Sequence, residues 1–396
     1  MVDRFTGNFT QQEPIPDDAI EAAVAVLRSG RLHRYNVAGD DPGETALLER
    51  EYAEWQGATY CIALASGGQA LQIAMRASGV IHGDQVLTNA FTLAPVPGAI
   101  AAVGGVPVLV EIDENLRLDL DDLEKKAQET GAKFLLLSHM RGHLCHMDRL
   151  MRIADGAGIK VIEDCAHTMG ATWNGTRSGN FGVAGCFSTQ TYKHMNSGEG
   201  GFLTTDDPDL AARAVILSGS YMLHQRHGAA PGPEVFAQIR LETPNMSARM
   251  DNLRAAILRP QLRGLERNVL RWNERYDAVA AGLEGNNSIR LPVRPEAETG
   301  VGSSIQFRVP GFSRDECQAL VRQAGERGVE LKWFGAAEPV GFTSDYRSWQ
   351  YIPKQHLPRS EEVLSTLFDL RLPLTFSVED CGVLARIISE TVSGVR

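Results

Sequence analysis

The sequence has no C-x-x-C pair, although it contains six cysteines in 396 residues. Scattered cysteines in a chain of this size indicate buried thiols in a reducing compartment and argue against a disulfide-stapled fold. The start, MVDRFTGNFTQQ, lacks the apolar core of a signal peptide, so we expect a cytoplasmic protein. The chain also lacks a long basic run, and its formal net charge is −10. We therefore expect no nucleic-acid or membrane partner bound through its overall charge.

One uncharged stretch, residues 86–110, is long enough to span a bilayer. It contains three prolines and three glycines, which divide it into short elements, so we expect a buried core there instead. Low-complexity linkers and internal repeats are absent, and 22% charged with 43% hydrophobic residues is the composition of an ordinary globular protein.

Short apolar runs alternate with helical patterns between about residues 43 and 217. Strands are predicted at residues 60–65, 85–89, 106–112, 134–139, 159–164, 183–189 and 200–205. This alternation predicts an α/β fold whose mainly parallel sheet is covered by helices on both faces.

The pattern changes to a smaller α+β unit after about Arg259. A long helical stretch is followed by predicted strands at 305–309 and 329–333 and by predicted helices at 314–328, 360–370 and 378–392. We predict a large domain over residues 1–260, and a linking helix with a small C-terminal domain over 261–396.

Polar residues follow three of the predicted strands, where ligands of open α/β sheets bind. Ser66-Gly67-Gly68-Gln69 opens a helix, and backbone N–H groups there suit a phosphate, although such turns are common for steric reasons. Asp164 ends a strand and could be only a helix cap. Lys193 lies in a loop rich in glycine and could be only solvated. Together, a phosphate site, a buried carboxylate and a lysine are what pyridoxal phosphate requires.

Three segments and one weaker one carry a family resemblance: GETALLEREYAEWQGATYCIALASG, VIEDCAHTMGATWNGTRSGNFGVAGCFST, YKHMNSGEGG and SARMDNLRAAILRPQL. In this order they resemble the DegT/DnrJ/EryC1/StrS family of pyridoxal-phosphate aminotransferases. The resemblance implies the aspartate-aminotransferase fold (fold type I), with a seven-stranded sheet in the large domain.

The resemblance also implies roles for individual residues. Catalytic roles fall on Lys193, as the Schiff-base lysine, on Asp164, beside the pyridine nitrogen, and on His167, near the phenolic oxygen. The phosphate contacts fall on Ser188 and on the loop that contains Gly67, Gly68 and Gln69, where the family usually has Thr-Ala at the last two positions. The presence of Lys193 disfavours the related sugar dehydratases, which have His there.

Some positions depart from the family pattern. Leu93 stands where an aromatic residue usually stacks on the cofactor, and Phe91 is close enough to supply some cover. The family's Asn that reaches the partner subunit's phosphate is replaced by Ser247, with Asn245 as the alternative. The segment facing the substrate is replaced by residues 332–351, which puts a nucleotide sugar in doubt. Candidate substrate residues in or beside that segment are Lys332, Trp333, Arg308 and Tyr346.

Two histidine-containing segments have simpler interpretations. His139, His143, Cys145 and His146 match no standard zinc spacing, so we predict no metal site. The HQRH segment, residues 224–227, is either a solvated loop or a loop at the substrate or at a subunit interface.

The sequence thus predicts an aminotransferase that moves an amino group from glutamate or glutamine to a keto group of a sugar, often nucleotide-linked, or of a cyclitol or another polar ketone. Two alternatives stay open: a pyridoxal-phosphate lyase or dehydratase, and a ligand-sensing regulator without turnover. The resemblance further implies a homodimer with shared active sites.

Overall fold

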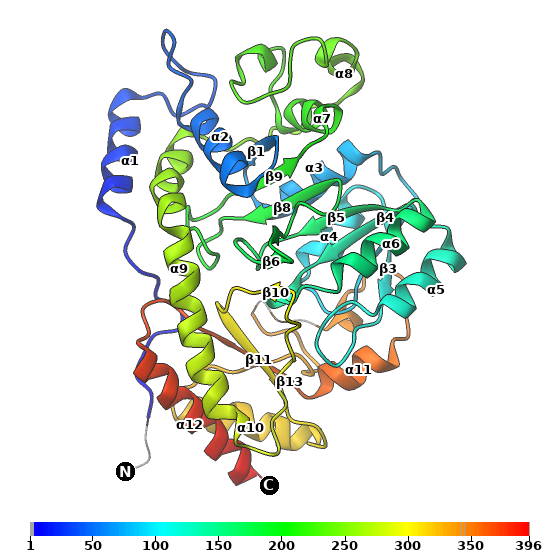
Figure 1. Ribbon diagram of the computed structural model, residues 1–396, viewed down its shortest axis with the longest axis vertical. Helices are drawn as coiled ribbons and strands as arrows, with labels where there is room; N and C mark the ends of the chain where they lie inside the picture. Colours follow the sequence, from blue (N-terminus) through cyan, green and yellow to red (C-terminus); the bar gives the residue numbers. More distant parts are fainter. Residues whose placement is uncertain (1–3, 342, 344, 396) are drawn as a thin grey trace.

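The structure is a computed structural model that describes residues 4–341, 343 and 345–395. Phe342 and Ser344, in the segment expected to face the substrate, lie outside the described residues. A seven-stranded sheet forms the centre of the larger part (Figure 1). Its strands are β1 (Tyr60–Leu64), β2 (Gln85–Asn89), β3 (Val106–Val110), β4 (Phe134–Ser138), β5 (Lys160–Asp164), β8 (Ala184–Ser188) and β9 (Gly201–Thr205).

The strand order is β1-β9-β8-β5-β4-β2-β3, and β9 runs antiparallel to both of its neighbours. The pairs β2–β3, β2–β4, β4–β5 and β5–β8 are parallel. The predicted α/β fold with a mainly parallel seven-stranded sheet is confirmed, and each strand coincides with one of the apolar runs.

Helices cover both faces of this sheet because successive strand residues point to opposite sides. In β4, Leu135 and Leu137 pack into one hydrophobic core and Leu136 into the other. The first core also receives α2 (Glu44–Gln56), α5 (Leu120–Thr130), α6 (Met147–Ala157) and part of α9 (Asn252–Glu284). The second receives α3 (Gly67–Ser78), α4 (Pro95–Ala102) and α7 (Pro208–Ser218).

Helix α9 connects the two parts of the molecule and runs along its length, with α1 (Asp17–Ser29) beside its first half (Figure 1). Its 33 residues begin after the N-cap Asp251 and include Pro260. The domain boundary predicted at residue 260 therefore falls inside one helix. That division stays a prediction.

The C-terminal part contains a three-stranded antiparallel sheet, called the small sheet below. Its order is β11 (Ser304–Arg308), β13 (Leu367–Arg371) and β12 (Lys332–Trp333). Helices α10 (Arg314–Glu326), α11 (Pro358–Ser365) and α12 (Val378–Val395) accompany it. The remaining elements are short: β6 (Thr172–Trp173), β7 (Thr176–Arg177), β10 (Glu298–Thr299), α8 (Phe236–Glu242), and the 3-10 turns η1 (Met140–Gly142), η2 (His224–Arg226) and η3 (Tyr346–Ser348).

The single helix predicted over residues 360–370 is wrong. Helix α11 ends at Ser365, and Leu367–Arg371 form β13, the central strand of the small sheet. Leu367, Phe368 and Leu370 are fully buried, and a short apolar run buried on both faces fits the helical and the strand period equally well.

The uncharged stretch at residues 86–110 divides, as expected, into β2, α4 and β3. Within the part of the chain that the structure describes, no helix has both the length and the apolar character needed to cross a bilayer.

Candidate active site

A pocket of about 380 Å³ lies where the carboxyl ends of β5 and β8 meet the start of α3 and the small sheet. Lys193, Asp164, His167, Ser188, Gly67, Gly68, Leu93 and Lys332 all line it. Residues far apart in the sequence thus converge on one cavity, at the edge of the sheet where ligands are expected.

Lys193 and His167 contact one another in this pocket. Nζ of Lys193 lies 2.9 Å from Nε2 of His167, and the backbone N–H of Lys193 donates to the carbonyl of Gln190. Burial lowers the pKa of Lys193 to about 7, with Asp164 opposing the shift and Arg141 and Arg371 adding to it. Burial, and then the charge of Lys193, hold the pKa of His167 well below its usual value. Near pH 7 the Lys193 amine is therefore neutral in about half of the molecules, and the neutral amine can act as a nucleophile.

The carboxylate of Asp164 is fixed by two hydrogen bonds at the end of β5. Ser138 donates its hydroxyl to Oδ2 at 3.0 Å, and the backbone N–H of Ala166 donates to Oδ1 at 3.2 Å. Ser138 is itself held, because its hydroxyl accepts from Thr92 at 2.8 Å and its backbone pairs with the side chain of Asn89. Among the described elements no helix begins directly after Asp164, so the interpretation of Asp164 as a helix cap is wrong.

The start of α3 and Ser188 form the anion-binding side of the pocket. Ser66 is the N-cap of α3, and its hydroxyl accepts the backbone N–H of Gln69 at 3.1 Å. The Gln69 amide is therefore already engaged, and Gln69 does not line the pocket. A Cβ on Gly67 would lie 2.8 Å from Cβ of Ser188, whereas one on Gly68 would meet only Ser66 Oγ, at 3.9 Å. Glycine at 67 is what allows the helix start to approach Ser188.

These groups fit pyridoxal phosphate. The helix start with Ser188 offers N–H and O–H donors to a phosphate, and Asp164 offers a buried carboxylate to a pyridine nitrogen. Lys193 offers an amine that is largely neutral above pH 7. The donor set thus matches the phosphate, the ring and the aldehyde of the cofactor.

The cover expected from Phe91 is not in place. Phe91 is 1% exposed and packs edge-on against Phe334, with ring centroids 5.0 Å apart. Leu93 does line the pocket, beside Pro95 and Val96 at the start of α4. The side chain at the position of the family's stacking residue is therefore aliphatic.

Of the four substrate candidates, only Lys332 lines the pocket. Trp333 points into the C-terminal core and donates Nε1–H to the carbonyl of Ser365, and the Tyr346 hydroxyl donates to Glu361. Arg308 pairs through its backbone with Arg290. Trp333, Tyr346 and Arg308 thus lie outside the lining of this pocket. For Trp333 the reason is strand alternation, which turns it away from the side that Lys332 faces.

The sequence did not single out Arg141, Arg371 or Tyr192, which also line the pocket. Arg371 ends β13, the strand misread as a helix. Arg141 lies in η1 with φ 55° and ψ 21°, a left-handed conformation that nothing in its residue type foretells. The loop context of Tyr192, one residue before Lys193, was the one available signal.

Asn245 and Ser247 are exposed and do not line the pocket of their own chain. Asn245 Oδ1 accepts the backbone N–H of Ser247 at 3.0 Å. The cap of α9 is Asp251, which accepts from the backbone N–H of Arg254, so Ser247 does not cap that helix. The neighbouring Ala248 pairs with Ala65 at the end of β1, which places this segment beside the start of α3.

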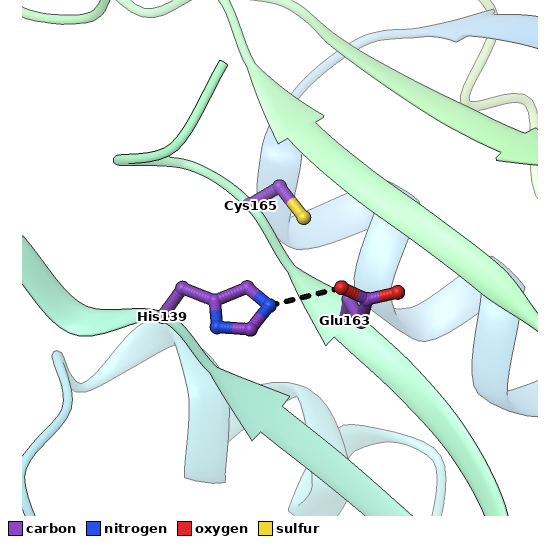
Figure 2. A group of neighbouring side chains, drawn as sticks. All are labelled: His139, Glu163 and Cys165. Carbon is purple, nitrogen blue, oxygen red and sulfur yellow. Dashed lines mark hydrogen bonds and ion pairs between the residues drawn. The ribbon is translucent and has the colours of Figure 1, made fainter. Parts of the chain in front are cut away.

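The histidines at residues 139–146 do not converge on one point, because each contacts a different partner. His143 Nε2 lies 2.8 Å from Gln306 Oε1, and His146 caps α6. His139 instead meets Glu163, with Cys165 nearby (Figure 2). The Glu163 carboxylate already accepts the N–H groups of residues 179, 181 and 182 as well. Burial raises the pKa of Cys165 well above its usual value, so its thiol stays neutral. The Glu163 carboxylate, bonded to His139 and to three backbone N–H groups, therefore belongs to a buried hydrogen-bond network.

The two histidines of the HQRH segment are buried, whereas Gln225 and Arg226 between them are exposed. His224 stacks on Phe236, and His227 is 1% exposed, with Nδ1 3.0 Å from the hydroxyl of Tyr35. Its role at a subunit interface stays a prediction.

Comparisons with known proteins agree with this geometry. Residues 15–388 match the model of the DegT/DnrJ/EryC1/StrS aminotransferase family. The chain is 34% identical over 357 residues to dTDP-3-amino-3,4,6-trideoxy-alpha-D-glucose transaminase from Streptomyces venezuelae, covering 88% of this chain and 86% of that one. It is 33% identical to L-glutamine:2-deoxy-scyllo-inosose aminotransferase from Streptomyces kanamyceticus, covering 64% and 60%. Matches to some other curated relatives are partial and span as little as 38% of their length.

Among solved structures, DesV from S. venezuelae in complex with a ketimine intermediate superposes with a TM-score of 0.78 at 27% identity, over 97% of this chain and 98% of that one. The family expected from the sequence motifs is confirmed across nearly the whole chain: this protein belongs to the DegT/DnrJ/EryC1/StrS aminotransferase family.

Proposed function

We propose that the protein uses pyridoxal phosphate, held as a Schiff base on Lys193, to move an amino group from glutamate or glutamine to the keto group of a sugar or a similar polyhydroxy ketone. The observation that carries this proposal is the Lys193 amine, with its pKa lowered to about 7, 2.9 Å from His167 in the pocket that Asp164 also lines. The aminotransferase class itself follows from the family match.

Bound pyridoxal phosphate supplies an aldehyde for imine exchange and a cationic ring that withdraws electrons from the substrate carbon. Asp164, fixed by Ser138, would keep a proton on the ring nitrogen by placing a negative charge beside it. The start of α3 and Ser188 would hold the phosphate through backbone N–H groups and a hydroxyl.

Lys193 is also the group placed to move the proton. Once freed from the cofactor, its amine stands inside the pocket with a pKa near the operating pH, so it can take a proton from one carbon and return it to another. His167, neutral under the same conditions, positions the amine through Nε2.

The substrate classes rest on the relatives. Glutamine and a cyclitol ketone appear in the name of the S. kanamyceticus relative, and a dTDP-linked sugar in that of the S. venezuelae relative. The polar lining of the pocket, which includes Gln190, Ser303 and Ser304, suits a hydroxylated ketone.

We also propose a cytoplasmic homodimer in which each chain completes the phosphate site of the other. Asn245 and Ser247 support this, because they are exposed on a segment beside the start of α3 and donate nothing to their own pocket.

The test of the proposed function is spectroscopic. The pure protein is loaded with pyridoxal phosphate and mixed with L-glutamate or L-glutamine, and conversion of the cofactor to its pyridoxamine form is followed by absorbance. A panel of ketosugars and cyclitol ketones should then restore the starting spectrum. A lyase would release its product without leaving the pyridoxamine form, and a sensor would show binding without conversion. Either result would replace the aminotransferase.

A further inference from the structure

The small-sheet side of the pocket carries more positive than negative charge. Arg141, Lys332 and Arg371 line it. The carboxylate facing them is that of Asp369, whose Oδ2 lies 2.8 Å from Nη2 of Arg141 and 3.6 Å from Nζ of Lys332. Asp369 is completely buried, and its Oδ1 also accepts from Gln306. Among the described residues on this side of the pocket, one carboxylate therefore faces three cations.

Arg141 is held in place by the backbone. It takes up the left-handed conformation in η1, and Gly142 follows with φ 85°. A Cβ at Gly142 would come within 3.3 Å of the carbonyl oxygen of His167, so the turn lies directly against the residue that contacts Lys193. A non-glycine residue in this conformation is strained, and such strain concentrates at functional sites.

The guanidinium of Arg141 has unused donors. Its side chain is 92% buried, and its ion pair with Asp369 is made through Nη2. Nε is buried without a hydrogen-bond partner among the described residues. A guanidinium has five N–H donors in a fork that matches a carboxylate, and a buried donor left without an acceptor is costly. A ligand that brought an oxyanion to this end of the pocket would supply acceptors.

Arg371 approaches the same end from β13. Its guanidinium lies over the ring of Tyr192, 3.9 Å from the centroid. Burial lowers the pKa of Arg371, and the positive charge of Arg141 lowers it further. Both guanidinium groups line the same pocket, so an anion bound between them would lower their mutual repulsion.

These cations lie apart from the phosphate side of the pocket. That side is formed by the start of α3 and the end of β8, whereas the cations come from η1, β12 and β13. The cofactor's phosphate therefore does not account for them.

We propose that Arg141 and Arg371, assisted by Lys332, form a subsite for a carboxylate group of the substrate that reacts in this pocket. The proposal rests on the proposed function for the nature of that substrate, an amino donor or a ketone acceptor. The carboxylate belongs either to glutamate or glutamine, or to an acidic sugar ketone.

Binding of an unreactive dicarboxylate tests the subsite without turnover. Glutarate is titrated calorimetrically into the protein loaded with pyridoxal phosphate. We expect binding at least about ten-fold weaker in Arg141→Gln and Arg371→Gln, and an intermediate loss in Arg141→Lys, which keeps the charge but not the fork. Arg28→Gln, an exposed residue of α1, is the matched control and should bind as the wild type does.

Two results of the binding titrations would overturn the subsite. One is unchanged glutarate affinity in both Arg141→Gln and Arg371→Gln. The other is tighter binding of inorganic phosphate than of glutarate, with the phosphate binding lost in Arg141→Gln. That result would assign the subsite to a phosphate. The cofactor spectrum and the melting temperature report whether each variant is folded. Arg141 and Arg371 belong to different elements, so if one variant fails to fold, the other variant still tests the subsite.

Kinetics then distinguish the source of the carboxylate. If it belongs to the donor, Arg141→Gln raises the KM for L-glutamate in forming the pyridoxamine form. If it belongs to the acceptor, the wild type prefers 5-keto-D-gluconate to D-fructose and Arg141→Gln abolishes that preference. If neither effect is seen in a protein that does transaminate, the subsite is refuted and the proposed function stands. Glutarate binding that depends on Arg141 in a protein that does not transaminate refutes the proposed function alone.

Discussion

The hydroxyl of Ser138 donates to the carboxylate of Asp164, with Oγ 3.0 Å from Oδ2. This bond joins the ends of β4 and β5, which pair in parallel at these two residues. It also connects Asp164 to Thr92, whose hydroxyl donates to Ser138. Asp164 is thus oriented by a chain of hydroxyl groups that leads back to the segment preceding α4.

Removing the first hydroxyl should weaken the role of Asp164 without emptying the pocket. A hydrogen bond to a charged group contributes about 1.5–3 kcal/mol, so Ser138→Ala should slow amino transfer by about ten-fold or more. Affinity for pyridoxal phosphate should change far less. Single-turnover rates with glutamate and equilibrium titration of the cofactor measure the two effects. Thr92→Val, one step further away, should cost less, and equal losses in both variants would contradict a positioning role for Ser138.

Replacing the carboxylate itself should cost more. Asp164→Asn keeps the shape but loses the negative charge, so we expect a loss of about 100-fold or more in amino transfer, the scale of a lost electrostatic contact in an active site. The cofactor should still bind through its phosphate. Asp155→Asn, an exposed residue of α6, is the matched control. Near-normal turnover in Asp164→Asn would show that its charge is not used.

The lowered pKa of Lys193 predicts how cofactor attachment depends on pH. Only the neutral amine attacks an aldehyde, and its neutral fraction rises about ten-fold per pH unit below the pKa. Because the pKa of Lys193 is about 7, attachment of pyridoxal phosphate to the free protein should speed up through pH 6 and level off above about 8. Stopped-flow absorbance measures this rate.

Borohydride reduction identifies the residue involved. It should fix the cofactor to Lys193 in the wild type, and Lys193→Ala should bind cofactor without covalent attachment. A label on another lysine, or a rate that keeps rising to pH 10, would reject the assignment of Lys193.

The functional residues at strand ends of the large sheet were easier to predict from the sequence than the residues that the small sheet contributes to the pocket. Asp164 ends one apolar strand and Lys193 follows another, and the topology of a mainly parallel sheet brings such positions together. Ser188, at the end of β8, was indicated only by the family resemblance. Asp369 and Arg371 were missed because residues 367–371 are apolar enough to fit either period, and their pairing with β11 and β12 is long-range. Arg141 was missed because its residue type gives no sign of the left-handed conformation that it adopts beside the pocket.

The shared active site predicts complementation between inactive chains. In a two-fold dimer each chain both gives and receives the same contact. Lys193→Ala supplies intact Asn245 and Ser247, whereas a chain with both of those residues changed to Ala supplies an intact Lys193. When the two inactive proteins are co-refolded, random mixing makes about half of the dimers mixed, and each mixed dimer has one intact site of two. About a quarter of the wild-type activity should therefore be restored. No recovery despite demonstrated subunit exchange, or full activity of a monomer, would exclude sharing.

Glycine at position 67 is the last requirement that can be tested by one small change. Its added Cβ in Gly67→Ala would lie 2.8 Å from Cβ of Ser188 and 3.3 Å from Cα of Ser188. The start of α3 would therefore move away from the end of β8 and open the phosphate side of the pocket. We expect affinity for pyridoxal phosphate to fall by about ten-fold or more, since each donor to a charged group is worth about 1.5–3 kcal/mol. Gly156→Ala is the control, because nothing lies within 4 Å of its added Cβ in α6, and it should gain up to about 1 kcal/mol of helix stability. Equal cofactor affinity in the two variants would mean that the approach of α3 to Ser188 does not hold the phosphate.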